Sequence, residues 1–304
     1  MNSNLQKKLV NKEFVVTAEC GPPRGANTAV ITKKIQLLNG HVDAVNVTDN
    51  QTAIVRMSSI AASAHLVAAG MEPVMQMVVR DRNRIAIQSD IMGAYSLGIR
   101  NILCLSGDHQ KFGSQPDALN VFDIDSTNLI HTVRQMRETG RDMSGYDLDQ
   151  APKMFIGAAA NPFADPFEYR VLRLAKKIAA GADFIQTQCI YNMEKFKEWI
   201  KQARDIGLTE KVFILGGVTP LRSAGMARYM NQRVAGMDIP DKVIRRMEQV
   251  PKEQAPEEGV QICLETIEEL KNLQGVHGVH IMAIEWEEIV GQIVQRSGLK
   301  KARG

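Results

Sequence analysis

The chain has 304 residues, of which 44% are hydrophobic and 23% are charged, and this globular composition suits one large α/β domain or two smaller ones. Its 37 basic and 34 acidic side chains leave a net charge of +3, too small an imbalance to indicate a nucleic-acid-binding surface. No apolar run approaches the length of a membrane span, residues 2–10 are too polar for a signal peptide, and the basic stretch 296–303 is typical of a solvated tail.

The four cysteines indicate neither a metal site nor a disulfide framework. Cys20, Cys104, Cys189 and Cys263 lie far apart and form no C-x-x-C pair, whereas zinc and iron–sulfur sites are usually built on closely spaced cysteines. Disulfide frameworks are typical of short secreted chains. We therefore expect a reduced, soluble, cytoplasmic protein without a cysteine-bound metal.

Short strand-like runs alternate with longer helical patterns along almost the whole chain. Strands are predicted over residues 14–19, 44–48, 74–79, 102–105, 154–160, 184–188, 212–215 and 279–283. Helices are predicted over residues 29–38, 53–69, 84–97, 127–139, 166–180, 193–206, 223–229, 241–250, 256–273 and 285–296. Six of these helices are followed by a glycine suited to a left-handed cap, namely Gly40, Gly70, Gly98, Gly140, Gly181 and Gly207.

This alternation predicts parallel strands covered by helices, because near-continuous apolar strands need cover on both faces. Eight such units over more than about 250 residues favour a single-domain (β/α)8 TIM barrel spanning residues 1–304. An open, doubly wound sheet is the alternative. No strand is followed by the G-x-G-x-x-G of a Rossmann dinucleotide site, so that site has no support.

In a barrel of this kind the functional groups gather at the C-terminal ends of the strands. Polar residues and glycines directly follow the apolar runs there, at positions 19, 48–50, 80–81, 106–108, 161–162, 188, 216–217 and 285. The irregular stretch 106–125 after the fourth strand is long for a compact domain. Such a stretch is either a functional loop or a surface insertion.

The stretch TAECGPP, residues 17–23, ends the first apolar strand with a carboxylate and two prolines. A charged side chain in this position needs a partner, a solvent opening or a catalytic role. Glu19 either pairs with a nearby cation such as Arg24 or serves as a functional acid. In the second case Pro22 and Pro23 would hold the turn rigidly beside it.

Further motifs occupy the other strand ends: VNVTDN at the second strand, RDRNR after the third, LSGD after the fourth, AANPFADP after the fifth, AGADFIQTQ at the sixth and GGVTPLRSAGMARYM after the seventh. With TAECGPPRG at the first strand, their order and spacing resemble the methylenetetrahydrofolate reductases, a family of flavin-dependent (β/α)8 barrels. The resemblance covers nearly the whole chain. RDRNR is most similar to the branch found in anaerobic, one-carbon-reducing bacteria.

The resemblance implies reduction of 5,10-methylenetetrahydrofolate to 5-methyltetrahydrofolate, in which a reduced flavin gives hydride to an iminium formed when the folate N10 is protonated. It makes Glu19 the general acid. That role requires a proton near neutral pH, although free glutamic acid has a pKa of about 4.3. Burial at the end of an apolar strand raises the pKa of a carboxyl group, because it disfavours the anion.

For the folate, the resemblance implies Asp108, Gln188 and Thr219. Asp108 would lie over the pterin and near the flavin as a second catalytic residue, whereas a loop aspartate that forms its own turn after Gly107 is the alternative. The amide of Gln188 can donate to and accept from the pterin edge. A core glutamine bonded to neighbouring backbone fits the same position.

For the flavin, FAD or FMN, the resemblance points to Thr48, Gln76, Ser106, Gly107, Asp108, Ala158, Asn161, Arg173, Lys176 and Lys177. Arg173 and Lys177 are four residues apart on a predicted helix, so they share a face that suits a phosphate group. A solvated basic helix surface explains them equally well. Asp165 and Pro166 are predicted to be the N-cap and first turn of this helix.

Two positions depart from the family pattern. Ser106 replaces an arginine, which removes a fixed positive charge near the flavin. Ala224 stands where some relatives have a phenylalanine that stacks on the nicotinamide. Electrons are therefore expected either from NADH or NADPH directly or from a partner subunit, as in the anaerobic branch. The resemblance also implies a homo-oligomer or a complex with such a partner.

Other functions compatible with a barrel remain open. A pterin-dependent methyltransferase shares the fold and the ligand but needs no flavin. A Schiff-base aldolase needs a lysine at a strand end, and none of the eight strand ends provides one. A non-catalytic structural subunit is the third alternative. Neither a nucleic-acid partner nor a membrane span is expected.

Overall fold

The computed structural model describes residues 3–299. Eight parallel strands pair in chain order, and β8 pairs with β1, so the sheet closes into a barrel. The strands are β1 (Val15–Cys20), β2 (Ala44–Val47), β3 (Pro73–Val78), β4 (Asn101–Leu105), β5 (Phe155–Ala160), β6 (Phe184–Cys189), β7 (Phe213–Val218) and β8 (Gly278–Ile281). This closure confirms the predicted (β/α)8 barrel and excludes the open doubly wound sheet.

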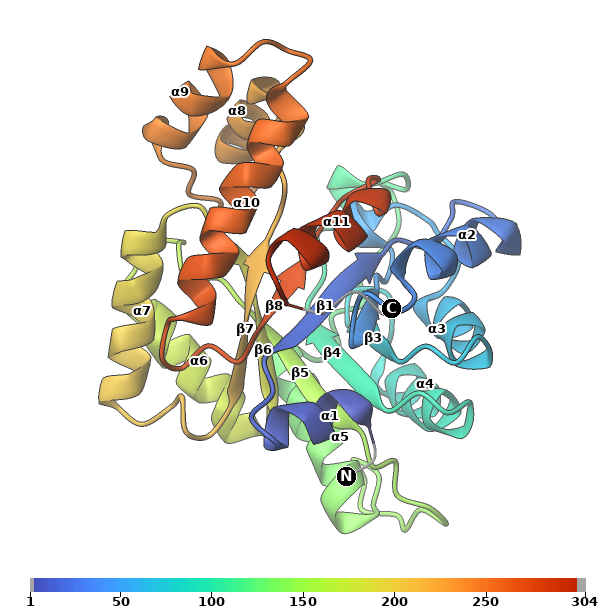
Figure 1. Ribbon diagram of the computed structural model, residues 1–304. Helices are drawn as coiled ribbons and strands as arrows, with labels where there is room; N and C mark the ends of the chain where they lie inside the picture. Colours follow the sequence, from blue (N-terminus) through green and yellow to red (C-terminus); the bar gives the residue numbers. More distant parts are fainter. Residues whose placement is uncertain (1–2, 300–304) are drawn as a thin grey trace.

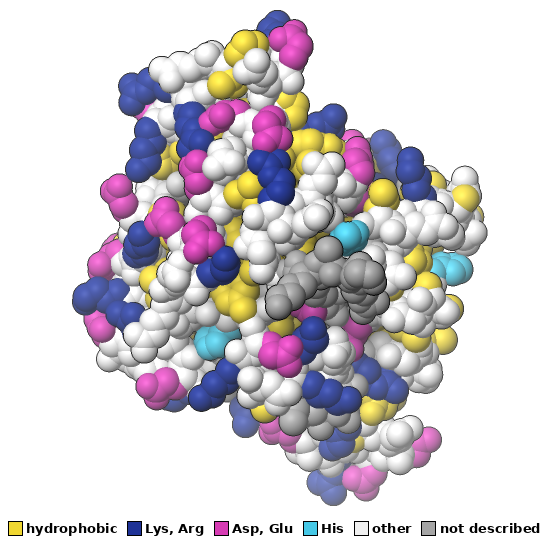
Figure 2. Space-filling view, viewed as in Figure 1, with side chains coloured by type: hydrophobic (Ala, Val, Ile, Leu, Met, Phe, Trp, Pro, Cys, Tyr) yellow, Lys and Arg dark blue, Asp and Glu magenta, His cyan; other side chains and the backbone are white. Residues whose placement is uncertain are grey.

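Helices surround the barrel (Figure 1). The covering helices are α2 (Thr28–Leu38), α3 (Ser59–Ala68), α4 (Arg84–Ser96), α5 (Ser126–Thr139), α6 (Tyr169–Ala180), α7 (Met193–Asp205), α10 (Ala255–Lys271) and α11 (Glu288–Arg296). The six predicted cap glycines all have positive φ, which an L side chain rarely adopts. Basic and acidic side chains are interspersed over the face in Figure 2, in line with the small net charge. Residues 300–303 of the predicted basic tail lie outside the described residues.

Alternation along the strands divides the apolar side chains into two layers. One set, such as Val16, Met75 and Ile214, packs against the helices. The other set lies inside the barrel at its N-terminal end, where the rings of Phe155 and Phe184 stack with centroids 5.0 Å apart. The lower end of the barrel is therefore a packed core, and any opening must lie at the other end.

Helix α1 (Asn4–Val10) was not predicted, because its sequence has few apolar residues. Two of them, Leu5 and Leu9, are buried in the core at the N-terminal end of the barrel. The Glu72 carboxylate accepts hydrogen bonds from the backbone N–H groups of Asn4 and Leu5, at 2.6 and 2.8 Å. The helix covers the lower end of the barrel (Figure 1).

Three predicted helix starts are wrong by three residues or more. The helix predicted over 285–296 begins at Glu288. The helix predicted over 53–69 begins at Ser59, because residues 50, 52 and 53 have positive φ and the 3-10 turn η1 (Gln51–Ala53) forms instead. The helix predicted from Pro166 begins at Tyr169 with Glu168 as N-cap, since residues 166–168 form a turn in which the Tyr169 N–H bonds to the Pro166 carbonyl.

Helices α8 (Ala224–Arg233) and α9 (Asp241–Gln249) form a lobe with one end of α10, above the barrel in Figure 1. This lobe has an apolar core of its own that includes Met230, Ile239 and Met247. The loop after β4 contains the second 3-10 turn, η2 (Gln110–Phe112), which packs against η1.

Gly157 on β5 leaves the space that the Phe184 ring fills, because a Cβ atom there would lie 2.3 Å from the Phe184 Cζ atom. We expect Gly157→Ala to lower the free energy of unfolding by about 1–3 kcal/mol through overpacking. Gly93→Ala on α4 is the control, since nothing lies within 4 Å of the new methyl group; it should raise stability by up to about 1 kcal/mol. Urea denaturation measures both, and equal stabilities would contradict the proposed packing.

Candidate functional site

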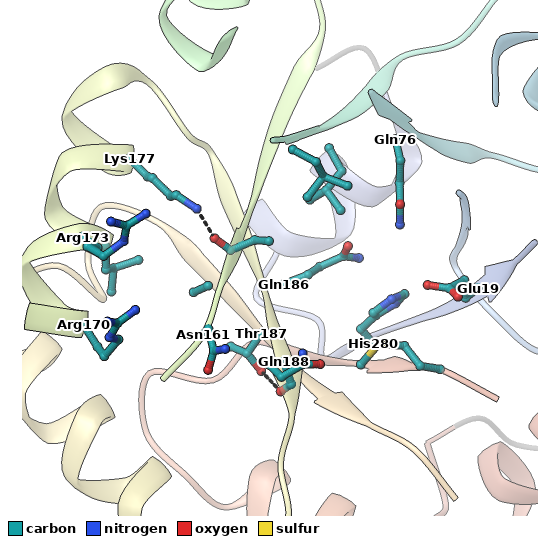
Figure 3. Close-up of a pocket in the computed structure, with 16 residues that line it drawn as sticks. Glu19, Gln76, Asn161, Arg170, Arg173, Lys177, Gln186, Thr187, Gln188 and His280 are labelled. Atoms are coloured by element: carbon teal, nitrogen blue, oxygen red, sulfur yellow. Dashed lines mark hydrogen bonds between the residues drawn. The ribbon is translucent and has the colours of Figure 1, made fainter. Parts of the chain in front are cut away.

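A cavity of about 340 Å³ opens at the C-terminal ends of the strands. It is lined by Glu19, Gln76, Leu103, Leu105, Ala159, Ala160, Asn161, Arg170, Arg173, Leu174, Lys177, Gln186, Thr187, Gln188, His280 and Met282. Figure 3 shows three cationic side chains on one side of this cavity, Glu19 and His280 on the other, and Gln186 between them. The cavity is therefore polar at opposite walls and apolar where the leucines lie.

The floor of the cavity is a hydrogen-bonded polar layer inside the barrel. The amides of Asn46 and Gln186 bond to each other twice, at 2.6 and 3.0 Å, although their strands β2 and β6 lie on opposite sides of the barrel. The Gln186 amide also donates to Thr17 Oγ1, which lies 2.9 Å from His280 Nδ1. Burial lowers the pKa of His280 to about 3, so its ring is neutral at physiological pH.

The cationic wall comes from α6. Arg170, Arg173 and Lys177 follow one another at spacings of three and four, which places them on one face of a helix. Lys177 Nζ donates to the Ala159 carbonyl at 2.5 Å, and burial together with Arg173 lowers the pKa of Lys177 to about 8. Such a wall suits an anionic group such as a phosphate.

Glu19 lies at the end of β1, partly buried and facing the cavity. Burial and the nearby Glu287 carboxylate raise its pKa to about 7, against the opposing effects of Lys34 and Arg56. Near neutral pH a large share of Glu19 therefore carries a proton. No ion pair between Glu19 and Arg24 occurs in the part of the chain that the structure describes, so the predicted alternative partner is not seen.

The two prolines after Glu19 lie in a turn fixed by hydrogen bonds from the segment after β2. The Pro22 carbonyl accepts from Arg56 Nη1 at 2.9 Å, and the Pro23 carbonyl accepts from the Met57 N–H at 2.9 Å. Lys34 Nζ reaches the Gly21 carbonyl at 3.0 Å. The backbone beside Glu19 is thus held in place from two directions.

A family model for methylenetetrahydrofolate reductase matches residues 4–298. The chain belongs to the methylenetetrahydrofolate reductase family. Similar proteins include a probable methylenetetrahydrofolate reductase (NADPH) of Caenorhabditis elegans, 22% identical over 100% of this chain and 45% of the relative. Methylenetetrahydrofolate reductase 2 of Schizosaccharomyces pombe is 28% identical over 73% of this chain and 35% of the relative. The chain thus spans less than half the length of these two relatives.

A solved structure shows the same fold. It is an uncharacterized protein from Clostridium thermocellum that binds two copies of 5-methyl-5,6,7,8-tetrahydrofolic acid. The two chains share 17% of their residues and superpose with a TM-score of 0.65, over 98% of this chain and 97% of the other.

Six of the residues predicted from the resemblance to methylenetetrahydrofolate reductases line the cavity together: Glu19, Gln76, Asn161, Arg173, Lys177 and Gln188. The predicted general acid, one folate residue and four flavin residues therefore lie around one space.

The predicted residues of the loop after β4 do not line the cavity. Asp108 is exposed, and its Oδ2 atom accepts from the Thr52 N–H at 3.1 Å, while its carbonyl accepts from Arg80 Nη1 at 2.9 Å. Gly107 has φ +87°, and a Cβ atom there would lie 3.0 Å from Val78. Ser106 is exposed beside it. These contacts keep the loop against η1 and β3.

Four other predicted residues lie elsewhere. Ala158 faces the helix layer and is fully buried there. Lys176 is exposed on α6, next to the cationic face. Thr219 is buried after β7, with Oγ1 2.9 Å from the Sγ atom of Cys189. Thr48 is buried at the end of β2.

Sequence reasoning missed several lining residues, above all Arg170, Gln186 and His280. Each could have been found by periodicity. Gln186 lies two residues before Gln188 and so shares its inward side of the strand, and Arg170 lies one helical turn before Arg173. His280 lies within the predicted strand 279–283, in which alternation again gives the inward positions.

Other charged strand-end residues bond to one another. Arg82 Nη1 lies 2.6 Å from Asp49 Oδ2, and Arg80 Nη2 lies 2.6 Å from Asp81 Oδ2. These pairs fix the loops after β2 and β3. Within residues 3–299 no group of three or more His, Cys, Asp or Glu side chains could hold a metal ion, and no helix is long and apolar enough to cross a membrane.

The raised pKa of Glu19 predicts a pH-dependent stability. Between its ordinary pKa of 4.5 and about 7 the carboxyl is ionised in the unfolded chain but protonated in the folded one, so rising pH favours unfolding. Relative to Glu19→Gln, the wild-type free energy of unfolding should fall by up to about 1.4 kcal/mol per pH unit in this interval. Urea denaturation between pH 4.5 and 8 tests this, and parallel pH profiles would refute it.

Proposed function

We propose that the protein is a flavoprotein that reduces 5,10-methylenetetrahydrofolate to 5-methyltetrahydrofolate. The observation that carries this proposal is Glu19, a carboxyl group with a pKa of about 7 that faces a cavity lined by amides and by a cationic wall. Membership of the methylenetetrahydrofolate reductase family supports it. The structural neighbour described as binding 5-methyltetrahydrofolic acid agrees with the ligand class.

The lining residues suit a flavin, which we propose to be FAD. Arg170, Arg173 and Lys177 offer positive charge to its phosphates, while Gln76 and Asn161 offer amides to its polar edge. When bound and reduced, the flavin supplies hydride. By resemblance, Thr48, Ser106, Gly107, Asp108, Ala158 and Lys176 remain proposed flavin contacts, and FMN remains the alternative cofactor.

The residues of the chain have three tasks in this reaction. Glu19 holds a proton and delivers it to N10 of the folate, so that the five-membered ring opens to the N5 iminium. Gln188 binds the pterin edge and orients the methylene carbon, and we propose Asp108 and Thr219 as further folate contacts. Leu103 and Leu105 present an apolar surface that excludes water from part of the cavity.

Electrons are proposed to come from NADH, from NADPH or from a partner subunit. Ala224, the position of the missing phenylalanine, lies at the start of α8, packed against the core of the lobe rather than lining the cavity. Rapid steady-state turnover of the chain alone with NADH or NADPH would show that no partner subunit is needed as the electron source.

Glu19→Gln removes the transferable proton but preserves the shape of the side chain. We expect this variant to bind flavin normally, and to lose at least about 10²-fold in the rate at which methylenetetrahydrofolate reoxidises the chemically reduced protein. In the wild type this rate should fall as pH rises through about 7. Stopped-flow absorbance measures both effects.

Glu210→Gln provides the matched control, because this exposed glutamate lies before β7 at the opposite end of the barrel. It should keep the full rate. Full folate turnover by Glu19→Gln would eliminate Glu19 as the acid, and a purified protein that stays colourless with every flavin would eliminate the flavoprotein function.

The cationic wall predicts a difference between adjacent lysines. Lys177→Met should weaken flavin binding about 10- to 100-fold, the range for losing a charged hydrogen-bonding group. Lys176→Met, a flavin contact by resemblance only, lies on the same helix outside the cavity and should weaken binding less than Lys177→Met. Fluorescence titration with FAD and FMN measures both variants. Equal losses would show that only the general charge of α6 matters.

A further inference from the structure

A second, smaller cavity lies behind Glu19. Its volume is about 30 Å³, and it is lined by Glu19, Gly21, Lys34, Gln51, Arg56, Ala283, Ile284, Glu285 and Glu287. Comparison of the two linings shows that, among the described residues, Glu19 alone borders both cavities. Glu19 therefore lies between the large cavity and the small one.

Residues that line the small cavity carry buried polar atoms that lack a hydrogen-bond partner within residues 3–299. Gln51 Oε1 and Arg56 Nε belong to its lining, and Thr48 Oγ1 is a third such atom nearby. Gln51 Oε1 and Thr48 Oγ1 both lie within 4 Å of the Cβ position of Gly21. Buried polar atoms of this kind are usually satisfied by an ordered water, and the volume is enough to hold one.

Two cationic and three carboxyl side chains line this cavity, and no group of three or more His, Cys, Asp or Glu within residues 3–299 could hold a metal ion. Lys34 from α2 lies 2.5 Å from Glu287 Oε1, and Arg56 faces the same space. The lining offers one amide, one guanidinium, one ammonium group and three carboxyl groups, and a water molecule can join such partners because it both donates and accepts.

The titratable groups near Glu19 that do not line the small cavity are neutral near pH 7. Burial raises the pKa values of the Cys20 and Cys189 thiols to about 12, and it lowers that of His280 to about 3. Proton exchange with Glu19 from within the barrel would thus have to pass through neutral, buried groups. The small cavity offers another route for proton exchange with Glu19.

The small cavity reaches the protein surface. Ile284 is 49% exposed and Glu285 is exposed as well, and both belong to its lining. Glu287, in contrast, is buried and held by Lys34. A water in the cavity therefore has solvent on one side and Glu19 on the other.

We propose that the small cavity holds a water that returns a proton from solvent to Glu19 after each turnover, with Glu287 and Gln51 as the residues that position it. This inference rests on the proposed function, in which Glu19 gives its proton to the folate. The Glu19 carboxylate then takes a proton from the water, and the water takes one from solvent at the Glu285 side. Because this proton arrives through the small cavity, Glu19 can be reprotonated while a ligand fills the large cavity.

The test separates the first turnover from later ones. At pH 6, below the Glu19 pKa of about 7, the acid is already protonated before mixing. In Gln51→Leu, which removes an acceptor without changing any charge, the first turnover should stay within about twofold of wild type. Later turnovers should slow at least about tenfold, and a small weak acid such as imidazolium should restore them.

Glu287→Gln supplies a readout that needs no turnover. Subtracting the infrared spectrum of Glu19→Gln isolates the carboxyl band of Glu19, whose titration midpoint should move to lower pH when the neighbouring negative charge is lost. Glu269→Gln is the control, because its pair with Lys197 has the same 2.5 Å separation but lies on the exposed surface. In the Glu269→Gln variant the titration midpoint of Glu19 should equal that of the wild type.

The outcomes distinguish this inference from the proposed function. If the wild type reduces methylenetetrahydrofolate but Gln51→Leu and Glu287→Gln sustain full multiple turnover without weak acid, the proton route is wrong and the proposed function stands. If the wild type reduces no methylenetetrahydrofolate even when a chemical reductant replaces the natural electron donor, the proposed function fails, and the proton route fails with it. Slowed later turnovers with weak-acid rescue, in variants that unfold at the wild-type temperature, support the route.

Discussion

The paired amides of Asn46 and Gln186 are the interaction on which the site depends. They connect opposite strands across the barrel, and each amide bonds to the other where both side chains are buried. A buried amide left without its partner costs about 1–3 kcal/mol, so the pair fixes both side chains. Below it the barrel is filled by apolar side chains, and above it the cavity begins. The pair therefore sets the depth of the cavity.

Glu19 illustrates how the barrel controls charge above this floor. The carboxyl group has opposing charges nearby, but Lys34 is bound to Glu287 and Arg56 to the Pro22 carbonyl. The cations are thus engaged elsewhere, and burial dominates the pKa of Glu19. The raised pKa of Glu19 therefore depends on which groups the neighbouring cations bind, and not on how many cations lie nearby.

Sequence patterns predicted the strands within about one to three residues, because buried parallel strands are continuous apolar runs bounded by glycine or polar residues. They failed where tertiary contacts override local preference. Residues 53–55 look helical, yet the loop after β4 packs against them, with the Ser114 N–H bonded to the Ala53 carbonyl. Asp108 was placed by family resemblance alone, and its bond to Thr52 depends on two loops that are distant in sequence.

The four cysteines have a consequence for experiment. All are buried as free thiols, in β1, β4, β6 and α10, and burial raises their pKa values, which disfavours the reactive thiolate. A thiol reagent can therefore modify Cys20, Cys104, Cys189 or Cys263 only when the surrounding structure opens. The rate of modification at each position measures how often that part of the barrel opens, so the native chain already contains four internal reporters of its own fluctuations.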